Sequence, residues 1–349
     1  MALKQAALCK LIWAAGIILV AVWASDQATT SAHTSRTNNA LMVEKHEKWM
    51  SEFGRDYKDD ADEKAKRLKI FSDNVEYIES FNKRTKSYKL RINKFTDLTN
   101  EEFRASRNGY KVMEFRQHYP SVSLINYAAE SDRVPSSIDW RQKGAVTHVK
   151  EQGDCGGCWA FSAVAAVEGI NQIKTTKLVT LSEQELIDCD TSQNQGCYGG
   201  TMNYAFDFII HNGLSSEKEY PYKGAVNEKC STRGKTVSIK ITGYESVPFK
   251  NESALLIAVA KQPISVAIDS SRREFQHYSE GVLNGVCGTK LDHGVTVVGY
   301  GEDHGIKYWL VKNSWGTKWG ERGYFRMQRD VDAPEGLCGI ALEAAYPTA

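Results

Sequence analysis

Beyond its N-terminal segment, the 349-residue chain has no apolar run that approaches the length of a membrane-spanning helix. It has no basic stripe either, because residues 134–349 hold 22 Lys and Arg against 25 Asp and Glu, a net charge of −3. Its last four residues are not an ER-retention signal. These absences argue against nucleic-acid binding, and they predict a mature product that is soluble, leaves the ER and does not bind a membrane.

The first residues have the composition of a targeting segment. Leu11–Ala24 is uncharged over 14 residues, whereas a spanning helix needs roughly 20. Two lysines precede this run, and the small residues Val22 and Ala24 suit a signal peptidase site. We therefore expect a secretory signal peptide over residues 1–24.

The cysteine count is odd once the signal is removed. The chain has 8 cysteines, and Cys9 would leave with the signal. The other seven lie at positions 155, 158, 189, 197, 230, 287 and 338. In an oxidising compartment this predicts three disulfides with one free thiol, or a disulfide to a partner chain. The sequence alone does not choose the pairing.

Composition divides the remaining chain into two regions. Residues 25–133 open with a polar lead, continue through a charged, helix-like stretch without cysteine or proline, and end in a looser segment. Residues 134–349 hold all seven remaining cysteines, and glycine and tryptophan concentrate there. This shift predicts a domain boundary between Arg133 and Val134.

A periodic stripe in the first region predicts a long amphipathic helix. Its members recur at spacings of three or four residues, which places them on one helical face. They are Glu63, Arg67, Phe71, Asn74, Ile78 and Asn82. Because the stripe mixes polar and apolar residues, we expect ion pairs and hydrogen bonds along it, with a second helix from the Leu41–Phe53 stretch as partner.

The second region predicts an α+β unit. Trp159–Ile170 is apolar on most sides and indicates a buried helix. Later segments are short, β-branched or aromatic and punctuated by glycine, which is typical of strands. They are residues 264–268, 294–300 and 307–312. Because the helices come first in this region and the strands later, we expect two lobes with a cleft between them. Such a cleft is the usual place for an active site.

Cys158 is the residue most suited to chemistry. It follows the glycine pair Gly156-Gly157 and opens the apolar helix, so the unpaired N–H groups of the first turn would stabilise a thiolate there. A thiol nucleophile needs a base and a third group that orients the base. His293, at the start of a predicted strand, is the best base. The histidines at 148, 211, 277 and 304 lie in polar stretches.

Three further residues complete a candidate catalytic site. The amide of Asn313 can accept the imidazole N–H of His293, and Trp315 or Trp319 can shield that bond from water. Gln152 lies six residues before Cys158. Its side-chain N–H₂ could meet the Cys158 backbone N–H around a developing oxyanion.

On these residues the chain resembles the papain family of cysteine endopeptidases, with a cathepsin L-type prosegment and a C-terminal stretch similar to plant members. The resemblance implies a papain-like two-lobed fold, with a helical left lobe and an antiparallel, barrel-like right lobe. It gives Cys158 as nucleophile, His293 as base and then acid, Asn313 as orienting residue and Gln152 as oxyanion donor. It implies no cofactor and no metal.

The family resemblance also implies a zymogen. Residues 25–133 would be a helical inhibitory propeptide that crosses the cleft until the chain is cut near Val134, leaving residues 134–349 as the mature peptidase. Catalysis would use a thiolate–imidazolium pair and a thioester intermediate. Acid release is a hypothesis, in which protonation of paired prosegment carboxylates such as Asp97 removes stabilisation.

Two residues depart from the family pattern. Gly157 stands where the family usually has Ser or Ala before the nucleophile. In the prosegment, Asn93, Phe95 and Asp97 match the second motif, but Arg91 replaces its usual glycine.

The resemblance also suggests disulfides and a substrate site. The implied disulfides are Cys155–Cys197, Cys189–Cys230 and Cys287–Cys338, which leaves Cys158 free. The residues implied to bind substrate are Gly199, Gly200, Thr201, Met202, Ala267, Leu291, Gly294, Glu343 and Trp315. An ionised Glu343 on the floor of the S2 pocket would accept Arg or Lys at P2 beside Leu or Phe.

Partners and location follow from the same resemblance. We expect protein and peptide substrates, the propeptide as an intramolecular inhibitor, cystatin-type inhibitors and a monomeric enzyme. The destination would be a vacuole, a lysosome-like compartment or the cell exterior. The sequon Asn251-Glu252-Ser253 predicts glycosylation at Asn251.

Other classes remain open from the sequence. Cys155-Gly156-Gly157-Cys158 also fits a thiol-disulfide protein, which predicts two jointly titrating thiols. A peptide ligase would use the same acyl-enzyme and differ only in water access. A structural zinc site is disfavoured because Cys189 and Cys197 are too far apart to form a close ligand pair. A binding protein on this scaffold would lack the nucleophile or the base, and both are present.

Overall fold

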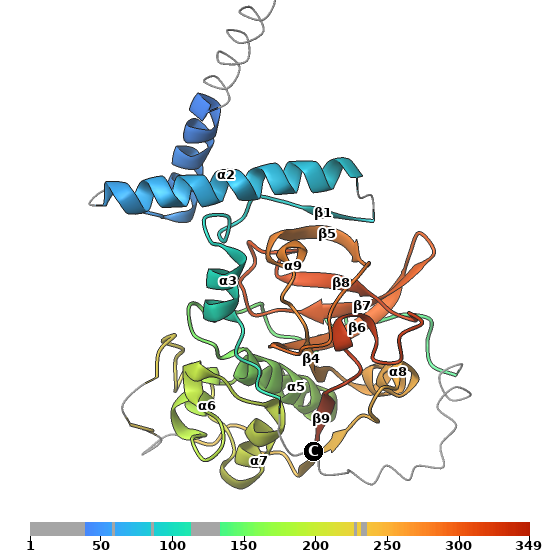
Figure 1. The fold of residues 1–349 in the computed structure, drawn as a ribbon. Coiled ribbons are helices and arrows are strands. Elements are labelled where there is room, and N and C mark those ends of the chain that lie inside the picture. The colour runs from blue at the N-terminus through green and yellow to red at the C-terminus, as the bar shows by residue number, and fades with distance from the viewer. Residues whose placement is uncertain (1–38, 58–59, 85–86, 113–132, 227–228, 232–235) are drawn as a thin grey trace, which may run out of the picture. The chain divides into compact units, whose positions relative to one another are not determined.

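The computed structural model describes residues 39–57, 60–84, 87–112, 133–226, 229–231 and 236–349 (Figure 1). The predicted signal peptide over 1–24 lies outside the described residues. The chain forms two compact units, Met1–Asp73 and Asn74–Ala349. Among the described residues, no helix is long and apolar enough to span a membrane.

In the first unit, a helix over residues 39–53 contacts the beginning of α2 (Ala61–Arg84). The rings of Trp49 and Phe71 have centroids 5.4 Å apart. Glu63 and Arg67 form an i, i+4 ion pair at 2.6 Å. The predicted long helix, its ion pair and its partner helix are therefore confirmed in this unit.

The second half of α2 belongs to the second unit, where its asparagines bind backbone groups. Asn74 Nδ2 donates to the carbonyls of Thr96 and Leu98 at 2.8 and 3.0 Å. Asn82 both donates to and accepts from the backbone of Leu90. These bonds hold the chain that follows α2, which forms β1 (Tyr88–Leu90) and α3 (Asn100–Arg107). The capping box of Thr99 and Glu102 starts α3.

Helices form one lobe of the second unit. They are α5 (Cys158–Thr175), α6 (Glu183–Cys189), η1 (Gly196–Tyr198) and α7 (Met202–Asn212). The predicted buried helix is α5, whose residues from Cys158 to Ile170 are all buried. Its many alanines and glycine let α6, α7 and the sheet approach closely, and these elements surround α5 in Figure 1.

Strands form the other lobe, together with short helices. The strands are β2 (Ile138–Asp139), β3 (Gly243–Ser246), β4 (Ile264–Ile268), β5 (Tyr278–Leu283), β6 (His293–Asp303), β7 (Ile306–Lys312), β8 (Tyr324–Gln328) and β9 (Ala344–Thr348). The helices are α8 (Glu252–Lys261), α9 (Arg273–His277) and η2 (Leu337–Gly339). The three predicted strands are thus confirmed as β4, β6 and β7.

The sheet order is β1-β5-β8-β7-β6-β4-β9-β3, with β2 paired to β6. Two details differ from the expected antiparallel barrel. The sheet is open, with β1 and β3 at its edges, and β5 runs parallel to β8. Strand β1 comes from the region before Val134 and pairs antiparallel with β5, so this region extends the sheet of the lobe.

Buried charges gather around Lys150. Lys150 Nζ donates to Glu183 at 2.7 Å and lies 3.5 Å from Glu168 and 3.2 Å from Glu217. Burial acts to lower the pKa of Lys150, but these carboxylates outweigh that effect and raise it. Such a cluster is stable only while every member is paired.

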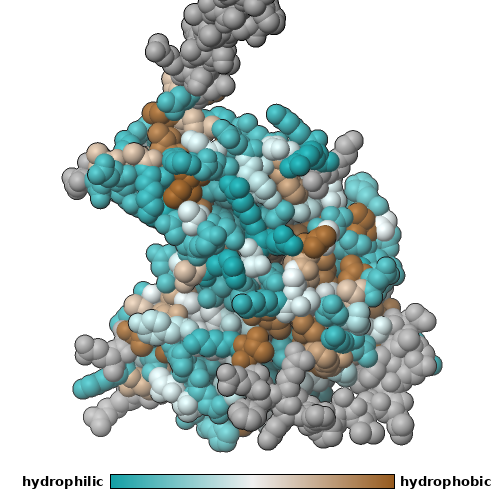
Figure 2. Space-filling model, in the orientation of Figure 1, coloured by the Kyte–Doolittle hydropathy of each residue, from teal (hydrophilic) through white to brown (hydrophobic). Residues whose placement is uncertain are grey.

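Figure 2 shows one outer face of the molecule. This face is mostly hydrophilic, with hydrophobic residues in small separate patches.

Candidate active site

Cys158 is the first residue of α5 and is fully buried. Gly157 is the N-cap, and a Cβ placed on it would lie 3.0 Å from Ile187 Cδ1. A Ser or Ala side chain at position 157 would press against Ile187. The glycine that departs from the family pattern therefore fits a position with little free space. The backbone N–H of Gly294 donates to Cys158 Sγ at 3.4 Å, which brings the residue after His293 onto the sulfur.

The thiol is neutral in this form of the chain. Burial raises the pKa of Cys158 to about 11, against the opposing effect of N–H groups from Gly294, Gly109 and Trp159. The predicted stabilisation of a thiolate by the helix terminus is therefore outweighed here. The physical reason is desolvation, since Cys158 has no exposed surface while residues 107–111 lie over the site.

His293 begins β6 and contacts Asn313, which follows β7. His293 Nε2 lies 2.8 Å from Asn313 Oδ1. Trp315 stacks on the imidazole with ring centroids 4.6 Å apart, and Trp319 meets Trp315 edge-on at 4.9 Å. Among the described residues, His293 Nδ1 has no hydrogen-bond partner. Burial lowers the pKa of His293 to about 4, so the imidazole is neutral as well.

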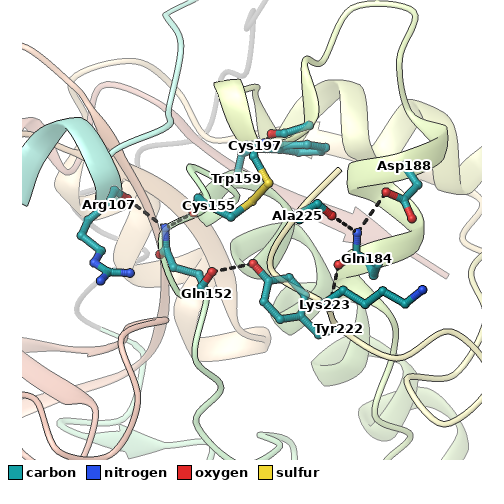
Figure 3. Close-up of a disulfide and its surroundings, with 11 residues drawn as sticks. Arg107, Gln152, Cys155, Trp159, Gln184, Asp188, Cys197, Tyr222, Lys223 and Ala225 are labelled. Carbon is teal, nitrogen blue, oxygen red and sulfur yellow. Dashed lines mark hydrogen bonds between the residues drawn. A yellow bond between two sulfur atoms is a disulfide. The ribbon is translucent and has the colours of Figure 1, made fainter. Parts of the chain in front are cut away.

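Gln152 is fully buried, and Figure 3 shows the two hydrogen bonds that its side-chain nitrogen donates. Its Nε2 donates to the carbonyl of Cys155 at 2.8 Å and to that of Arg107 at 2.9 Å. Its Oε1 accepts from Ser314 and Trp315. The side-chain nitrogen of Gln152, which we expected to donate to an oxyanion, thus donates to the backbone carbonyl oxygen of Arg107, in the region before Val134.

Residues 107–111 lie along the expected substrate site. The N–H of Gly200 donates to Gly109 O at 2.9 Å, and the N–H of Lys111 donates to Gly200 O at 3.0 Å. Tyr110 N–H donates to Asp292 O at 3.1 Å, next to His293. A Cβ on Gly109 would lie 1.8 Å from Gly156 O, so only glycine fits there. This segment blocks access to Cys158.

The structure brings the expected S2 residues together. Met202, Ala267 and Leu291 belong to one buried apolar cluster. Ala267 is paired with Gly294 across β4 and β6, and its N–H donates to Glu343 O at 3.0 Å. The other expected residues lie beside them, with Thr201 as the N-cap of α7, Gly199 and Gly200 before it, and Trp315 over His293.

The disulfides are Cys155–Cys197, Cys189–Cys230 and Cys287–Cys338, as the resemblance implied. In the described part of the chain, Cys158 is the free cysteine. Because Cys155 is bonded to Cys197, it does not pair with Cys158, and the thiol-disulfide alternative is wrong.

Sequence reasoning missed several contacts. Arg107 forms an ion pair with Asp154 at 2.6 Å, Lys94 pairs with Glu151, and Arg104 lies 3.6 Å from Asp292. These partners are far apart in the sequence, and no local pattern links them. His277 is fully buried although it lies in a polar stretch of the sequence.

Comparisons with known proteins agree with this geometry. Residues 134–348 match the family model "Papain family cysteine protease", and residues 46–103 match "Cathepsin propeptide inhibitor domain (I29)". The free thiol, the imidazole beside it and the segment that blocks them together define a thiol protease held in its proform. The chain belongs to the papain family of cysteine proteases, and it is a cysteine endopeptidase made as a zymogen.

Several known proteins are similar in sequence to most of this chain. Vignain of Ricinus communis is 55% identical over 82% of this chain and 80% of its own length. The KDEL-tailed cysteine endopeptidase CEP2 of Arabidopsis thaliana is 53% identical over 82% of this chain and 80% of its own length. The structure of recombinant stem bromelain precursor is 50% identical, covers 88% of this chain and 99% of its own, and has a TM-score of 0.80.

Proposed function

We propose that Cys158 is the nucleophile of this endopeptidase and that His293 is its base. The observation that carries the proposal is a free thiol at the start of α5, with an imidazole on β6 held by Asn313 and covered by Trp315. Hydrolysis of a dipeptidyl fluorogenic substrate by the processed chain tests it. Activity that survives in Cys158→Ala would overturn the assignment.

The reaction proceeds by transfer of the Cys158 proton to His293 Nδ1. The thiolate sulfur attacks the peptide carbonyl carbon, and the negative charge moves to the carbonyl oxygen, beside Gln152 Nε2 and the Cys158 N–H. His293 then gives the proton to the leaving amine as the C–N bond breaks. Water, deprotonated by His293, attacks the thioester and releases the acid and the thiol.

Asn313 has a positioning role in this scheme. Its Oδ1 binds Nε2, so Nδ1 remains the nitrogen that exchanges a proton with the thiol. The stacked Trp315 keeps water from competing for the Asn313 contact. Gln152 is supported as the oxyanion donor because its Nε2 already binds a carbonyl oxygen, that of Arg107.

Activation requires removal of the segment over the site. We propose a signal peptide over 1–24, a propeptide over 25–133 and a mature peptidase over 134–349, with cleavage near Val134. Once residues 107–111 leave, water reaches Cys158 and His293, and the desolvation that keeps both neutral falls. The thiolate–imidazolium pair then forms.

Acid promotes this release in our proposal. His293 has its pKa lowered by burial to about 4, so its protonation between pH 6.5 and 4 favours states in which the site is open. Precursor that matures equally fast at pH 7 and pH 4.5 would remove this proposal.

The S2 pocket would accept basic as well as apolar P2 residues. Glu343 is partly buried beside the apolar cluster of Met202, Ala267 and Leu291, so its carboxylate can pair with a P2 arginine while the walls bind P2 leucine. The measurement is kcat/KM for P2-Arg and P2-Leu substrates. A Glu343→Ala variant should lose P2-Arg cleavage selectively, and equal losses on both substrates would contradict the assignment.

Partners and destination are also proposals. We infer that a cystatin-type inhibitor binds the open cleft and that the enzyme is a monomer, which the mostly hydrophilic face in Figure 2 supports. Relatives that include a KDEL-tailed endopeptidase support the secretory pathway, with a vacuole, a lysosome-like compartment or the exterior as destination. Asn251 caps α8 through Oδ1, which leaves its nitrogen for a glycan.

Peptide ligation is the second function that this acyl-enzyme permits. The name of the Arabidopsis thaliana relative, a KDEL-tailed cysteine endopeptidase, favours hydrolysis. Mass spectrometry of a peptide reaction with added amine nucleophile distinguishes the two, because a hydrolase yields mainly the free acid.

A further inference from the structure

Arg91, which stands in place of the usual glycine, binds the peptidase region through its side chain. One guanidinium nitrogen, Nη2, donates to Lys318 O at 2.7 Å and to Gly320 O at 3.1 Å. The backbone N–H of Arg91 donates to His277 O at 2.9 Å. Glycine at this position would keep the backbone bond and lose both side-chain bonds.

The two carbonyls are held by a rigid turn. Gly320 has a φ of +57°, and a Cβ on it would lie 2.5 Å from Tyr324 O, so its backbone has little room to change. Trp319, between the two carbonyl residues, is fully buried and donates its indole N–H to Gln276 O at 3.3 Å. The acceptors are therefore fixed before Arg91 binds, which lowers the entropic cost of the contact.

This contact differs in kind from the ion pairs that the prosegment makes with the peptidase region. Lys94, Arg104 and Arg107 face the carboxylates of Glu151, Asp292 and Asp154. Carboxylates lose charge in acid, whereas a carbonyl oxygen does not titrate and a guanidinium stays charged. The two hydrogen bonds of the Arg91 side chain therefore do not depend on the charge of a carboxylate.

We propose that the carbonyls of Lys318 and Gly320 form a guanidinium-binding notch on the peptidase, and that this prosegment docks into it through Arg91. The partner is the chain's own prosegment. The contact slows release in acid and adds to latency at neutral pH. This inference rests on the proposed peptidase function and adds a determinant of how the inhibitor domain is retained.

The expected effect is modest because Arg91 is exposed to solvent. Hydrogen bonds from a charged donor contribute more than neutral ones, and solvent reduces that gain. We expect the loss of both bonds to raise the open population about tenfold.

The test uses the full-length chain with Arg91→Gln, Arg91→Lys and a matched control, Arg84→Gln. Arg84 is also an exposed prosegment arginine, but it binds Ser80 O of its own helix at 3.4 Å. Latent hydrolysis at pH 7 and the rate of processing at pH 4.5 are measured. Arg91→Gln should raise both about tenfold, Arg91→Lys should recover part of the latency, and Arg84→Gln should match the wild type.

A second readout does not depend on activity. In the Cys158→Ala full-length chain, hydrogen exchange of the peptide around Arg91 should be about tenfold faster with Arg91→Gln, without a fall in the global unfolding midpoint. Exchange and latency equal to those of Arg84→Gln would overturn the notch. Absence of peptidase activity in the processed wild type would instead overturn the proposed function, and the exchange result would still decide the notch.

Discussion

His293 Nε2 lies 2.8 Å from Asn313 Oδ1, beneath the stacked ring of Trp315. The contact joins the first residue of β6 to the residue after β7, two strands that are paired along their length. In the mechanism that we propose, this contact orients the imidazole so that Nδ1 is available to the thiol. The orientation of the base thus depends on the sheet rather than on a loop.

Replacing Asn313 with alanine should lower kcat/KM of the processed enzyme by about 100-fold, because a misplaced catalytic group costs that order of rate. The measurement is steady-state hydrolysis of a dipeptidyl substrate, with its pH profile. Asn212→Ala is the control, since Asn212 only binds Phe208 O on the surface of α7. Equal kcat/KM in the two variants would show that Asn313 does not orient the base.

Replacing Gln152 with alanine should reduce kcat about 100- to 1,000-fold and leave KM nearly unchanged, because an oxyanion donor acts in the transition state. Gln172→Ala, on the outer part of α5, is the matched control. A rise in KM with unaltered kcat would mean that Gln152 binds substrate rather than the oxyanion.

The burial of His277 should lower the free energy of unfolding in acid. It is fully buried, neither ring nitrogen has a hydrogen-bond partner among the described residues, and burial, with a smaller effect of Arg273, lowers its pKa to about 3. The unfolded chain takes up a proton at pH 6.5, so stability is full above that pH and falls as pH decreases toward 3. Between pH 6.5 and 4.5 the loss should be about 2 to 3 kcal/mol.

Denaturant unfolding of the Cys158→Ala full-length chain measures this effect. In His277→Leu, the free energy of unfolding should fall by about 2 to 3 kcal/mol less between pH 6.5 and 4.5 than in the parent chain. In the exposed control His148→Leu, it should fall as much as in the parent chain. An unchanged pH dependence in His277→Leu would contradict the burial of a neutral imidazole.

Replacing Lys150 with methionine should destabilise the protein by about 3 to 5 kcal/mol, because Glu168 and Glu183 would be left as buried carboxylates without their cation. Unfolding of the full-length chain at pH 7 is the measurement, and Lys290→Met is the control on the surface. A loss below about 1 kcal/mol, the size of a surface pair, would mean that the cluster contributes little to the stability of the fold.

Local patterns predicted the elements and much of the site. Strand β4 covers the expected residues 264–268, and α2 contains the whole stripe from Glu63 to Asn82, since periodicity reflects which face is buried. The motifs around Cys158, His293 and Asn313 indicated the proposed catalytic residues, which the fold brings together across the two lobes.

Contacts between segments far apart in the chain could not be predicted from the sequence. The neutral state of Cys158 arises because residues 107–111 exclude water, and the bonds of Arg91 to Lys318 and Gly320 join segments more than 200 residues apart. The parallel pairing of β5 with β8 likewise depends on how distant strands meet. Desolvation and tertiary contacts of this kind leave no periodic signal in the chain.

The most direct test of the central claim is mass spectrometry of the chain treated with a thiol-directed epoxide at pH 7, before and after processing. We expect one label on Cys158 of the processed chain, with hydrolysis lost in proportion to labelling. We expect almost no label on Cys158 of the intact chain, where burial raises the thiol pKa to about 11. Equal labelling of Cys158 in both forms, or full hydrolysis by the labelled enzyme, would contradict it.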